Sequence, residues 1–488
     1  MLRKLIIFLI CCIFTTAASY GTGVADSFHF THFKSADGLP HQQIQAMAFD
    51  HDGRLWIGTR NGLASYDGYG FTTYYHNPVD GHSLPHNFVL SVFVDSRGTV
   101  WISTENGFCR YMPATDDFEK ISSIDERRIF CIRETQDGNI ICGGGRIYMG
   151  DAVSGEFHYM PRQKERDVRG IAVSPDNRVF ITTDDAVTYY DSKMQSGTQV
   201  DLGLFASSLH GTDGIAPLIF DSCGRMWVSL NGNGVMCLDV KTGERSRYDN
   251  SVLTSGTVRA IAEDARGNIW LGTERGINII DPDTGKVTKV MQDLVNPTKL
   301  NDNAIYCIVP DANNNIWIGT YFGGINLLTD NCNQFTWTAP GYDSRSLKGK
   351  AIRRIVEPEK GELWLASEDG GINILNIGTG NVRTFDRIPD IGPNVHELFF
   401  DDANGDMWIG TFLNGLYRHN MRTGSTSHYM AGENGLKSTS IFSILKQYQA
   451  DGGSKLWVGT TQGLRYYDPS SDTFHKIDHS VLDNDFIY

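Results

Sequence analysis

Positive charge is scarce in this sequence, and long apolar runs are confined to its start. The chain carries 43 Lys and Arg against 57 Asp and Glu among 488 residues, a formal net charge of −14 at pH 7. A surface of this sign repels phosphate backbones and anionic lipid, so we expect no nucleic-acid partner. After residue 18 no stretch approaches 18 apolar residues, so the mature chain is expected to have no membrane-spanning helix.

Sequence signatures of catalysis and of metal binding are also lacking. The 14 His are dispersed, with no HExxH motif and no paired His or Cys–His spacing. No GxSxG motif or comparable nucleophile–base pair occurs. The sequence therefore predicts no catalytic residue, no metal site and no cofactor.

Cysteine is sparse and irregularly spaced. Two of the nine Cys lie within the first 12 residues. The remaining odd number argues against a disulfide framework and favours buried thiols. The sequence leaves one disulfide as an alternative, between Cys131 and Cys142, which are predicted to lie on neighbouring strands. The seven later cysteines are Cys109, Cys131, Cys142, Cys223, Cys237, Cys307 and Cys332.

The one long apolar run has the features of an export signal. Arg3 and Lys4 precede ten apolar residues, Leu5–Phe14, and small residues follow at positions 16–19. A basic start, a short apolar run and small residues are typical of a cleaved secretory signal peptide. Residues 1–18 are therefore predicted to be a signal peptide, and the mature chain is expected to be periplasmic or exported.

Against these absences stands one repeated phrase, seen first in Asp50–Asp67 as DHDGRLWIGTRNGLASYD. Two degenerate copies carry Ile141 and Phe180 at the Trp position, which makes ten copies spaced 39 to 49 residues apart. A period of this size is typical of stacked or radial arrays. Eight of the nine Trp hold the same place in the phrase, namely Trp56, Trp101, Trp227, Trp270, Trp317, Trp364, Trp408 and Trp457.

Each copy is predicted to form four short strands. In the second copy they are expected at Val89–Val94, Val100–Thr104, Phe108–Tyr111 and Phe118–Ile121, separated by turn residues. Four antiparallel strands in each copy predict a blade of a β-propeller. Helical periodicity is absent, so the predicted fold class is all-β. A series of β-sandwiches is the weaker alternative, because sandwiches do not repeat one Trp at this interval.

Phe28–Phe33 reads as a strand without a blade of its own. It resembles the outer strand of a copy and is predicted to complete the blade that carries Trp317, which would remove a free edge. The predicted domains are a seven-bladed β-propeller over residues 28–340 and a partial second one over 341–488. The second would hold three blades and the start of a fourth at Leu482–Tyr488. A single ring of ten blades is disfavoured, because propellers mostly have four to eight.

The full phrase, (I/V)xxIxxDxxGxxW(I/L/V)GTxxGLxxYD, resembles the two-component regulator propeller repeat. Asp50–Asp67, Asp264–Asp281 and Gly453–Asp468 fit it closely, and the resemblance covers Phe28 to Tyr488. It implies the periplasmic sensor region of a hybrid two-component regulator, whose members sense glycan fragments. In such proteins two seven-bladed propellers precede an immunoglobulin-like module, a membrane helix, a histidine kinase, a receiver and a DNA-binding domain.

Ten copies are fewer than that plan requires. The chain is therefore expected to be a truncated sensor without kinase or DNA-binding output, and not to signal by itself. Blades eight to ten would leave apolar faces open at both ends of the row. We expect this part to be less stable than the first ring and to self-associate.

Ligand contacts are expected on the variable loops. The loops that enter the inner strands and those between the second and third strands share one face, and loops on a rigid scaffold often carry function. Charged or amide groups beside an aromatic ring suit a saccharide, although any single one is more often a solvated turn residue. The candidate ligand-binding residues are Arg60, Asn61, Glu105, Arg146, Asp185, Asn231, Arg275 and Tyr321.

Three hypotheses follow from these patterns. The chain is a periplasmic ligand-sensing propeller that binds oligo- or polysaccharide fragments, a propeller enzyme of lyase or glycosidase type, or a protein-interaction scaffold. The D-x-x-G turns and the repeated Trp are interpreted as tight hairpin turns and inter-blade core, not as chemistry.

Overall fold

The computed structural model describes residues 28–162, 166–203, 216–230, 232–294, 296, 298–329, 338–341, 343–432, 434–449, 453–479 and 482–488. The predicted signal peptide, Cys332 and the site candidate Asn231 lie outside them. Regular structure within the described residues is all β-strand apart from one short 3-10 helix, η2 (Ser35–Asp37). None of the described helical structure has the length and apolar character of a membrane span.

The predicted all-β propeller fold is confirmed. The described strands form ten four-stranded antiparallel sheets, and each holds one copy of the repeat. In the second copy every strand end lies within one residue of its predicted position. Chain contacts divide the molecule into two units, residues 1–333 and 334–488. The domain limits at 28–340 and 341–488 stay predictions.

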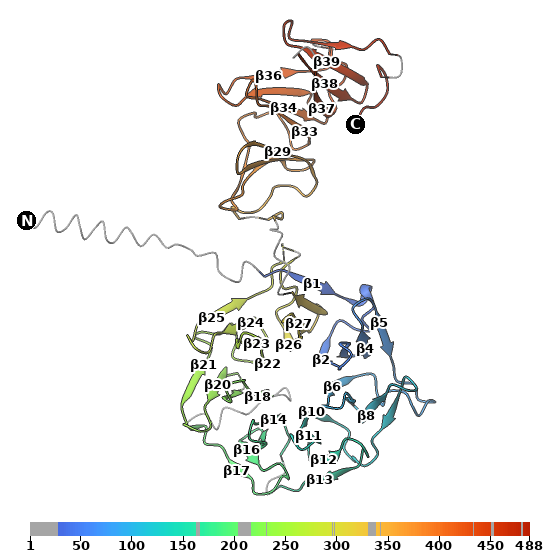
Figure 1. Cartoon of the computed structure of the whole chain (residues 1–488), viewed down its shortest axis with the longest axis vertical. Helices are drawn as coiled ribbons and strands as arrows, with labels where there is room; N and C mark the ends of the chain where they lie inside the picture. Colours follow the sequence, from blue (N-terminus) through green and yellow to red (C-terminus); the bar gives the residue numbers. More distant parts are fainter. Residues whose placement is uncertain are drawn as a thin grey trace, which may run out of the picture. The chain divides into compact units, whose positions relative to one another are not determined.

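Unit 1 contains seven sheets in the described residues, numbered here as blades one to seven (Figure 1). From the inner to the outer strand, blade one contains β2 (Ile44–Phe49), β3 (Leu55–Thr59), β4 (Gly62–Tyr66) and β5 (Phe71–Tyr74), and blade two contains β6 (Val89–Val94), β7 (Val100–Thr104), β8 (Gly107–Met112) and β9 (Asp117–Lys120). Blade three contains β10 (Ile129–Glu134), β11 (Asn139–Gly144), β12 (Ile147–Asp151) and β13 (Phe157–Tyr159), and blade four contains β14 (Gly170–Val173), β15 (Val179–Thr182), β16 (Val187–Tyr190) and β17 (Thr198–Gln199). Blade five contains β18 (Leu218–Phe220), β19 (Met226–Ser229), β20 (Val235–Leu238) and β21 (Arg245–Tyr248), and blade six contains β22 (Val258–Glu263), β23 (Ile269–Thr273), β24 (Gly276–Ile280) and β25 (Val287–Val290). Blade seven contains β26 (Ile305–Pro310), β27 (Ile316–Thr320), β28 (Ile325–Leu328) and β1 (Phe30–Phe33).

The N-terminal strand closes the ring of unit 1. β1 pairs antiparallel with β28, in the sheet that contains Trp317, as predicted. The Phe33 ring stacks on the Trp317 ring, with centroids 5.8 Å apart and planes 14° apart. Inner strand β2 contacts β26 as well as β6, so the seven inner strands form a closed circle around the centre in Figure 1. Closure gives every blade two neighbours and leaves no open sheet face in the ring.

Unit 2 contains three sheets in the described residues, numbered as blades eight to ten. Inner strand β33 contacts both β29 and β37, so the three blades stand in a row. From the inner to the outer strand, blade eight contains β29 (Ile352–Glu359), β30 (Glu362–Ser367), β31 (Gly371–Asn376) and β32 (Val382–Thr384). Blade nine contains β33 (Val395–Asp401), β34 (Asp406–Thr411), β35 (Leu416–Asn420) and β36 (Thr426–Tyr429). Blade ten contains β37 (Ile441–Tyr448), β38 (Ser454–Thr460), β39 (Gly463–Asp468) and β40 (Thr473–Lys476).

One hydrogen-bond pattern explains why the repeat pairs an Asp with a Trp six residues later. In blade two, Asp95 Oδ1 accepts the backbone N–H groups of Arg97 (3.0 Å) and Thr99 (2.8 Å), while Oδ2 accepts Trp101 Nε1–H (2.9 Å). The carboxylate therefore shapes the turn and orients the indole, which is fully buried. We name this arrangement the Asp–Trp latch. It recurs in the pairs Asp50–Trp56, Asp221–Trp227, Asp264–Trp270 and Asp311–Trp317, with indole bonds of 2.9 to 3.2 Å.

The degenerate copies change both members of the latch together. Where Ile141 and Phe180 replace Trp, Thr135 and Ser174 replace Asp. Both hydroxyls still serve the turn, since Thr135 Oγ1 accepts Asn139 N–H (3.1 Å) and Ser174 Oγ accepts Arg178 N–H (3.1 Å). A carboxylate is thus present in the copies whose Trp indole N–H needs an acceptor. In the two copies without an indole, a hydroxyl is enough to hold the turn.

A second recurrent contact sets the spacing between blades. A Cβ on Gly58 of β3 would come within 2.6 Å of Val89 Cγ1 on the next inner strand. Gly319 of β27 meets Ile44 of β2 in the same way, with a Cβ-to-Cγ2 distance of 2.7 Å, across the point where the ring closes. In blade two the position is Ser103, whose Oγ donates to the carbonyl of Ile129 in the next blade (2.6 Å). Because neighbouring blades approach each other closely at this point, the Gly position of the W-I-G-T phrase requires a small residue.

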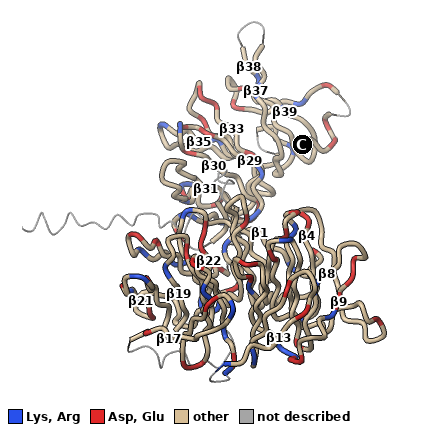
Figure 2. Tube along the Cα trace, turned by 60° about the horizontal axis from the view of Figure 1, so that its bottom comes forward, with Lys and Arg blue, Asp and Glu red and all other residues tan. Residues whose placement is uncertain are grey.

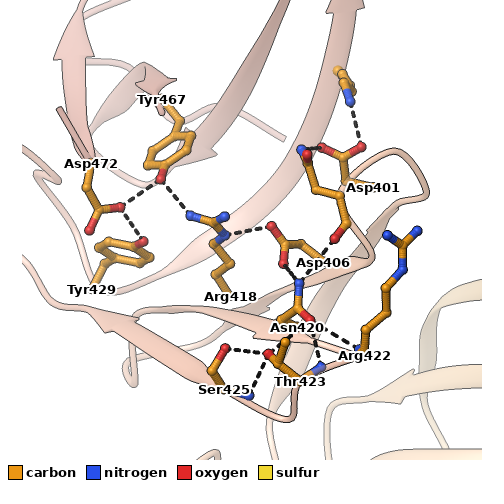
Figure 3. Close-up of polar contacts among 12 residues, drawn as sticks. Asp401, Asp406, Arg418, Asn420, Arg422, Thr423, Ser425, Tyr429, Tyr467 and Asp472 are labelled. Atoms are coloured by element: carbon orange, nitrogen blue, oxygen red, sulfur yellow. Dashed lines mark hydrogen bonds and ion pairs between the residues drawn. The ribbon is translucent and has the colours of Figure 1, made fainter. Parts of the chain in front are cut away.

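Figure 3 shows a polar network around Asp406 and Arg418 in unit 2. It lies beside Trp408, at the place where unit 1 has the latch. Asp406, 2% exposed, accepts Arg418 Nε–H (2.7 Å) through one oxygen and Asn420 Nδ2–H (2.7 Å) through the other. Arg418 lies over the Trp408 ring at 5.6 Å and donates to Tyr467 Oη in blade ten (2.9 Å). The network thereby joins blades nine and ten with its buried charges paired.

The described cysteines are free thiols. Cys142 pairs with Ile132 across β10 and β11, whereas Cys131 pairs with Gly143, so the two side chains point to opposite faces of the blade. They lie in different core clusters, and the bridge that their spacing left open is not formed. Burial raises the pKa of the Cys131 thiol to about 12.

Removing one latch carboxylate should destabilise unit 1. Asp95→Ala leaves the buried Trp101 indole N–H without an acceptor, which costs about 1–3 kcal/mol for that donor alone. Asp67→Ala is the matched control, because Asp67 accepts two turn N–H groups but no indole. Urea unfolding followed by tryptophan fluorescence should show a large loss for Asp95→Ala and a much smaller one for Asp67→Ala. Equal losses would contradict the role given to the indole bond.

Glu397 should make the stability of unit 2 depend on pH. Burial, opposed by the Arg354 guanidinium 2.9 Å away, raises the Glu397 pKa from 4.5 to about 7. Between these values the folded state holds a proton that the unfolded state has lost, so stability falls as pH rises from about 4.5 to about 7. The stability difference between wild type and Glu397→Gln should change over this window. The exposed control Glu359→Gln should show no such change, and a flat difference for Glu397→Gln would refute the shift.

Candidate functional site

The variable loops of unit 1 form one interlocked face. We call it the loop face, defined as the loops that enter the inner strands together with those between the second and third strands. The two sets are joined by backbone hydrogen bonds between blades, such as Gly62 N–H to Asn87 O (2.7 Å) and Gly276 N–H to Asn303 O (2.7 Å). Acidic and basic residues are interspersed over the unit and form no field of one sign (Figure 2). The loop face is thus a rigid frame with local, separate polar groups.

Five inner strands of unit 1 have a β-bulge near their start, and two of the bulged residues, Arg259 and Tyr306, contact residues of the loop face. The register shifts at the second residue of β2, β6, β10, β22 and β26. Bulges commonly serve to re-aim side chains near functional sites. The bulged residues are Gln45, Leu90, Phe130, Arg259 and Tyr306.

Candidates on blades two to four are held in ion pairs. Glu105 pairs with Arg128, and Arg146 pairs with Asp125 at 3.0 Å. Asp185 accepts Thr183 Oγ1–H at 2.9 Å and lies 3.8 Å from Arg166. These groups are already partnered, so on this side the loop face holds its own loops together.

The charges around Arg146 are set by burial and hydrogen bonds. A hydrogen bond from Tyr148 holds the Asp125 pKa below its usual value, so this carboxylate is ionised beside Arg146. Burial raises the Glu126 pKa, although its carboxylate accepts the backbone N–H groups of Gly145 and Arg146. Both acidic groups fix the loop between β11 and β12.

Blades six, seven and one present a different surface. Tyr321 packs against Tyr306 (ring centroids 5.3 Å apart) and against Phe322 (4.3 Å). Phe322 is 72% exposed, and its backbone N–H donates to Asp302. We call Tyr306, Tyr321 and Phe322 the aromatic step. It stands in the blade between those that carry the candidates Arg275 and Arg60.

The two arginines on the blades next to the aromatic step are exposed. Arg60 lies over the Phe88 ring at 5.1 Å, and its exposed guanidinium has no carboxylate partner among the described residues. The same holds for exposed Arg275, whereas neighbouring Glu274 is ion-paired to Arg259. Asn61, next to Arg60, donates its backbone N–H to Thr59 Oγ1 (3.1 Å). The ring therefore brings Arg60, Tyr321 and Arg275 to adjacent blades, on the opposite side from Arg146 and Asp185.

A polar hollow adjoins Arg275 on the loop face. Its volume is about 500 Å³. The lining is almost entirely hydroxyl, amide and charged groups, from Asn250, Thr254, Ser255, Thr257, Glu274 and Arg275. Such a lining can exchange hydrogen bonds with a polyhydroxylated ligand.

Two further hollows of unit 1 lie beside the D-x-x-G turns, away from the candidates. One, of about 390 Å³, is lined by Asp264, Trp270 and Lys286 among others. The other, of about 530 Å³, includes Arg54, Arg97 and Arg110. Among the described residues, no group of three or more His, Cys, Asp or Glu side chains is arranged to hold a metal ion.

Sequence reasoning missed three contributors to the loop face, Phe88, Arg259 and Tyr306. Arg259 and Tyr306 each follow the first residue of an inner strand, whereas Phe88 precedes one. Comparing the second position of the inner strands across copies would have found Arg259 and Tyr306, but not Phe88. The histidines that precede β2 and β6 have a structural role instead, since His41 and His86 accept a backbone N–H through Nδ1.

Comparison with known proteins agrees with this architecture. The sequence model of the two component regulator propeller family matches residues 38–61, 83–106, 252–275 and 299–322. A 54-residue stretch is 41% identical to Histidine kinase P4 of Formosa agariphila, covering 11% of this chain and 4% of the kinase.

Solved structures match over most of the chain. An extracellular domain from B. thetaiotaomicron, assigned to a hybrid two-component system, is 21% identical with a TM-score of 0.65; the match covers 93% of this chain and 61% of that one. Virginiamycin B lyase from Staphylococcus aureus is 16% identical with a TM-score of 0.50, covering 62% of this chain and 99% of the lyase. At these identities the two likenesses show the fold alone.

The chain spans about three fifths of that extracellular domain and a small fraction of the kinase. The matched repeats contain the latch and the loop between the second and third strands, including Arg60, Glu105, Arg275 and Tyr321. The chain thus carries sequence repeats that match the two component regulator propeller model at four places, all within unit 1.

Proposed function

We propose that this chain is the ligand-sensing region of a hybrid two-component regulator, located in the periplasm or outside the cell. Its ligand is an oligo- or polysaccharide fragment bound on the loop face of unit 1, across blades six, seven and one. The observation that carries the proposal is the exposed aromatic step between two guanidinium groups that have no carboxylate partner.

The chemistry of these groups suits a sugar. A pyranose ring has an apolar C–H face that packs on an aromatic side chain, as Phe322 would allow. Its hydroxyls, or an acidic substituent, accept charge-assisted hydrogen bonds from Arg60 and Arg275. The polar hollow beside Arg275 offers room for a second sugar unit. Kinase and DNA-binding output would belong to other parts of such a regulator.

Two other functions have less support. A lyase or glycosidase needs an acid, base or metal that touches the substrate, and no observation in the described residues favours one. The lyase likeness extends to the fold only. Self-association through unit 2 is a separate proposal, supported by exposed apolar side chains on the inner strands of its end blades: Ile355, Leu445 and Tyr448.

Calorimetric titration of a tetrasaccharide panel tests the site. The panel contains cellotetraose, xylotetraose, mannotetraose and tetragalacturonate. The double variant Arg60→Ala, Arg275→Ala should weaken binding of the best member at least about tenfold, equivalent to about 1.4 kcal/mol. Its unfolding free energy should stay within about 0.5 kcal/mol of wild type, because both residues are exposed.

The matched control is Arg54→Ala, Arg97→Ala, which removes two exposed arginines from the D-x-x-G turns. It should bind as wild type does. Equal affinity in both double variants, or no binding of any panel member to wild type, would refute the proposed site.

A further inference from the structure

An exposed apolar loop of unit 2 is held in a strained conformation. Phe412 and Leu413 lie between β34 and β35, and they are 39% and 60% exposed. Leu413 has φ = +76°, a left-handed conformation that a branched residue adopts at a cost of about 1–3 kcal/mol. Burial does not compensate this cost, since the side chain stays in water. Strain of this kind clusters at sites of function.

The loop is fixed at both ends, so the strain is imposed by its surroundings. Phe412 N–H donates to Asn394 O (3.1 Å), and Gly415 N–H donates to Thr439 O (2.8 Å) of the next blade. Asn414 Nδ2–H donates to Asp390 O (3.2 Å). These bonds place Phe412 and Leu413 on the outside of a rigid loop.

An aromatic cluster lies beneath the loop. The His396 ring is stacked on the Phe412 ring, with centroids 5.6 Å and planes 14° apart. Phe442 meets His396 edge-on at 4.6 Å. His396 and Phe442 are the bulged residues of inner strands β33 and β37, the position that Arg259 and Tyr306 hold in unit 1. Together the three rings form a platform with the Phe412 ring partly open to solvent.

A polar edge borders the platform. Arg353, the bulged residue of β29, pairs with Glu368 at 3.3 Å, and Glu368 lies 3.7 Å from His396 Nε2. Arg353 and Glu368 are each about two-fifths exposed. His396 is 8% exposed, and its Nδ1 makes no hydrogen bond within the described residues. A buried polar atom without a partner is the kind of exception that a missing ligand or water explains.

We propose that this platform is a second saccharide site, distinct from the loop face of unit 1. A pyranose ring packs its C–H face on Phe412 and Leu413, and its hydroxyls bond to Glu368 and Arg353 at the edge. Burial and the Arg353 charge lower the His396 pKa, so a neutral imidazole supports the platform. The inference rests on the proposed function only in taking the ligand to be a saccharide.

A protein partner fits the surface less well. The exposed apolar side chains of this cluster are Phe412 and Leu413, with Phe486 and Tyr488 packed beside Phe442. Four side chains form a small patch, whereas a stable protein interface needs about 800 Å² from each partner. The half-exposed Arg353–Glu368 pair next to it would have to be desolvated by such a partner. A sugar hydroxyl can instead join that pair by hydrogen bonds.

Titration of the same four tetrasaccharides, using the whole chain, tests the second site. Wild type should bind two equivalents of at least one panel member. Phe412→Ala should bind one, while Phe412→Trp should restore the second because it keeps an aromatic face. Tyr448→Ala removes an exposed aromatic elsewhere in unit 2 and should leave both equivalents. Leu413→Gly should relieve the strained φ without unfolding the unit.

The variants also separate this site from the first one. Arg60→Ala, Arg275→Ala should retain the equivalent that Phe412→Ala loses. One equivalent in wild type that survives Phe412→Ala would overturn the second site and leave the loop face standing. Sedimentation velocity supplies the remaining check. If Phe412→Ala abolishes self-association while no saccharide binding depends on it, the platform is a protein contact and the proposal fails.

Discussion

The bond from a turn carboxylate to an indole N–H is the interaction on which the rest of unit 1 depends. Each latch fixes the hairpin between the first two strands and the orientation of the Trp that fills the space between blades. In two copies the Asp and Trp positions change together, to Thr135 with Ile141 and to Ser174 with Phe180. The residue at the Asp position therefore depends on the residue at the Trp position. A buried donor must be satisfied, and a hydroxyl-capped turn without one can hold an aliphatic or Phe side chain.

Because the latches fix each blade at its D-x-x-G turn, the loops at the opposite end of the blade are free to vary in sequence. Blade spacing is set by small residues such as Gly58 against the next inner strand, and backbone hydrogen bonds join the loops of neighbouring blades, so the side chains of the loop face are free to differ between copies. The ring uses this freedom unevenly. Around Arg146 and Asp185 the charges neutralise one another, whereas Arg60 and Arg275 flank an aromatic step without carboxylate partners. The difference between these two sides argues for a ligand at one of them.

Most of the fold could be predicted from sequence because its determinants are local. Strand bounds such as Val89–Val94 follow from turn residues, and the role of Phe30–Phe33 follows from a spare strand that needs an edge. The side-chain pairing of the loop face could not be predicted. It depends on bulges at Arg259 and Tyr306, and on conformations of long side chains set across blades. The strain at Leu413 is likewise invisible in sequence, because a Leu in a turn carries no signal of a positive φ.

The central claim is that a saccharide binds the loop face of unit 1 across blades six, seven and one. Hydrogen–deuterium exchange of the whole chain, with and without the tightest tetrasaccharide of the panel, tests it most directly. Binding should slow exchange at residues 60–62, 274–276 and 302–304 and around 321–323, and leave the D-x-x-G turns unchanged. Protection confined to those turns, or no change anywhere in unit 1 at saturating sugar, would contradict the account.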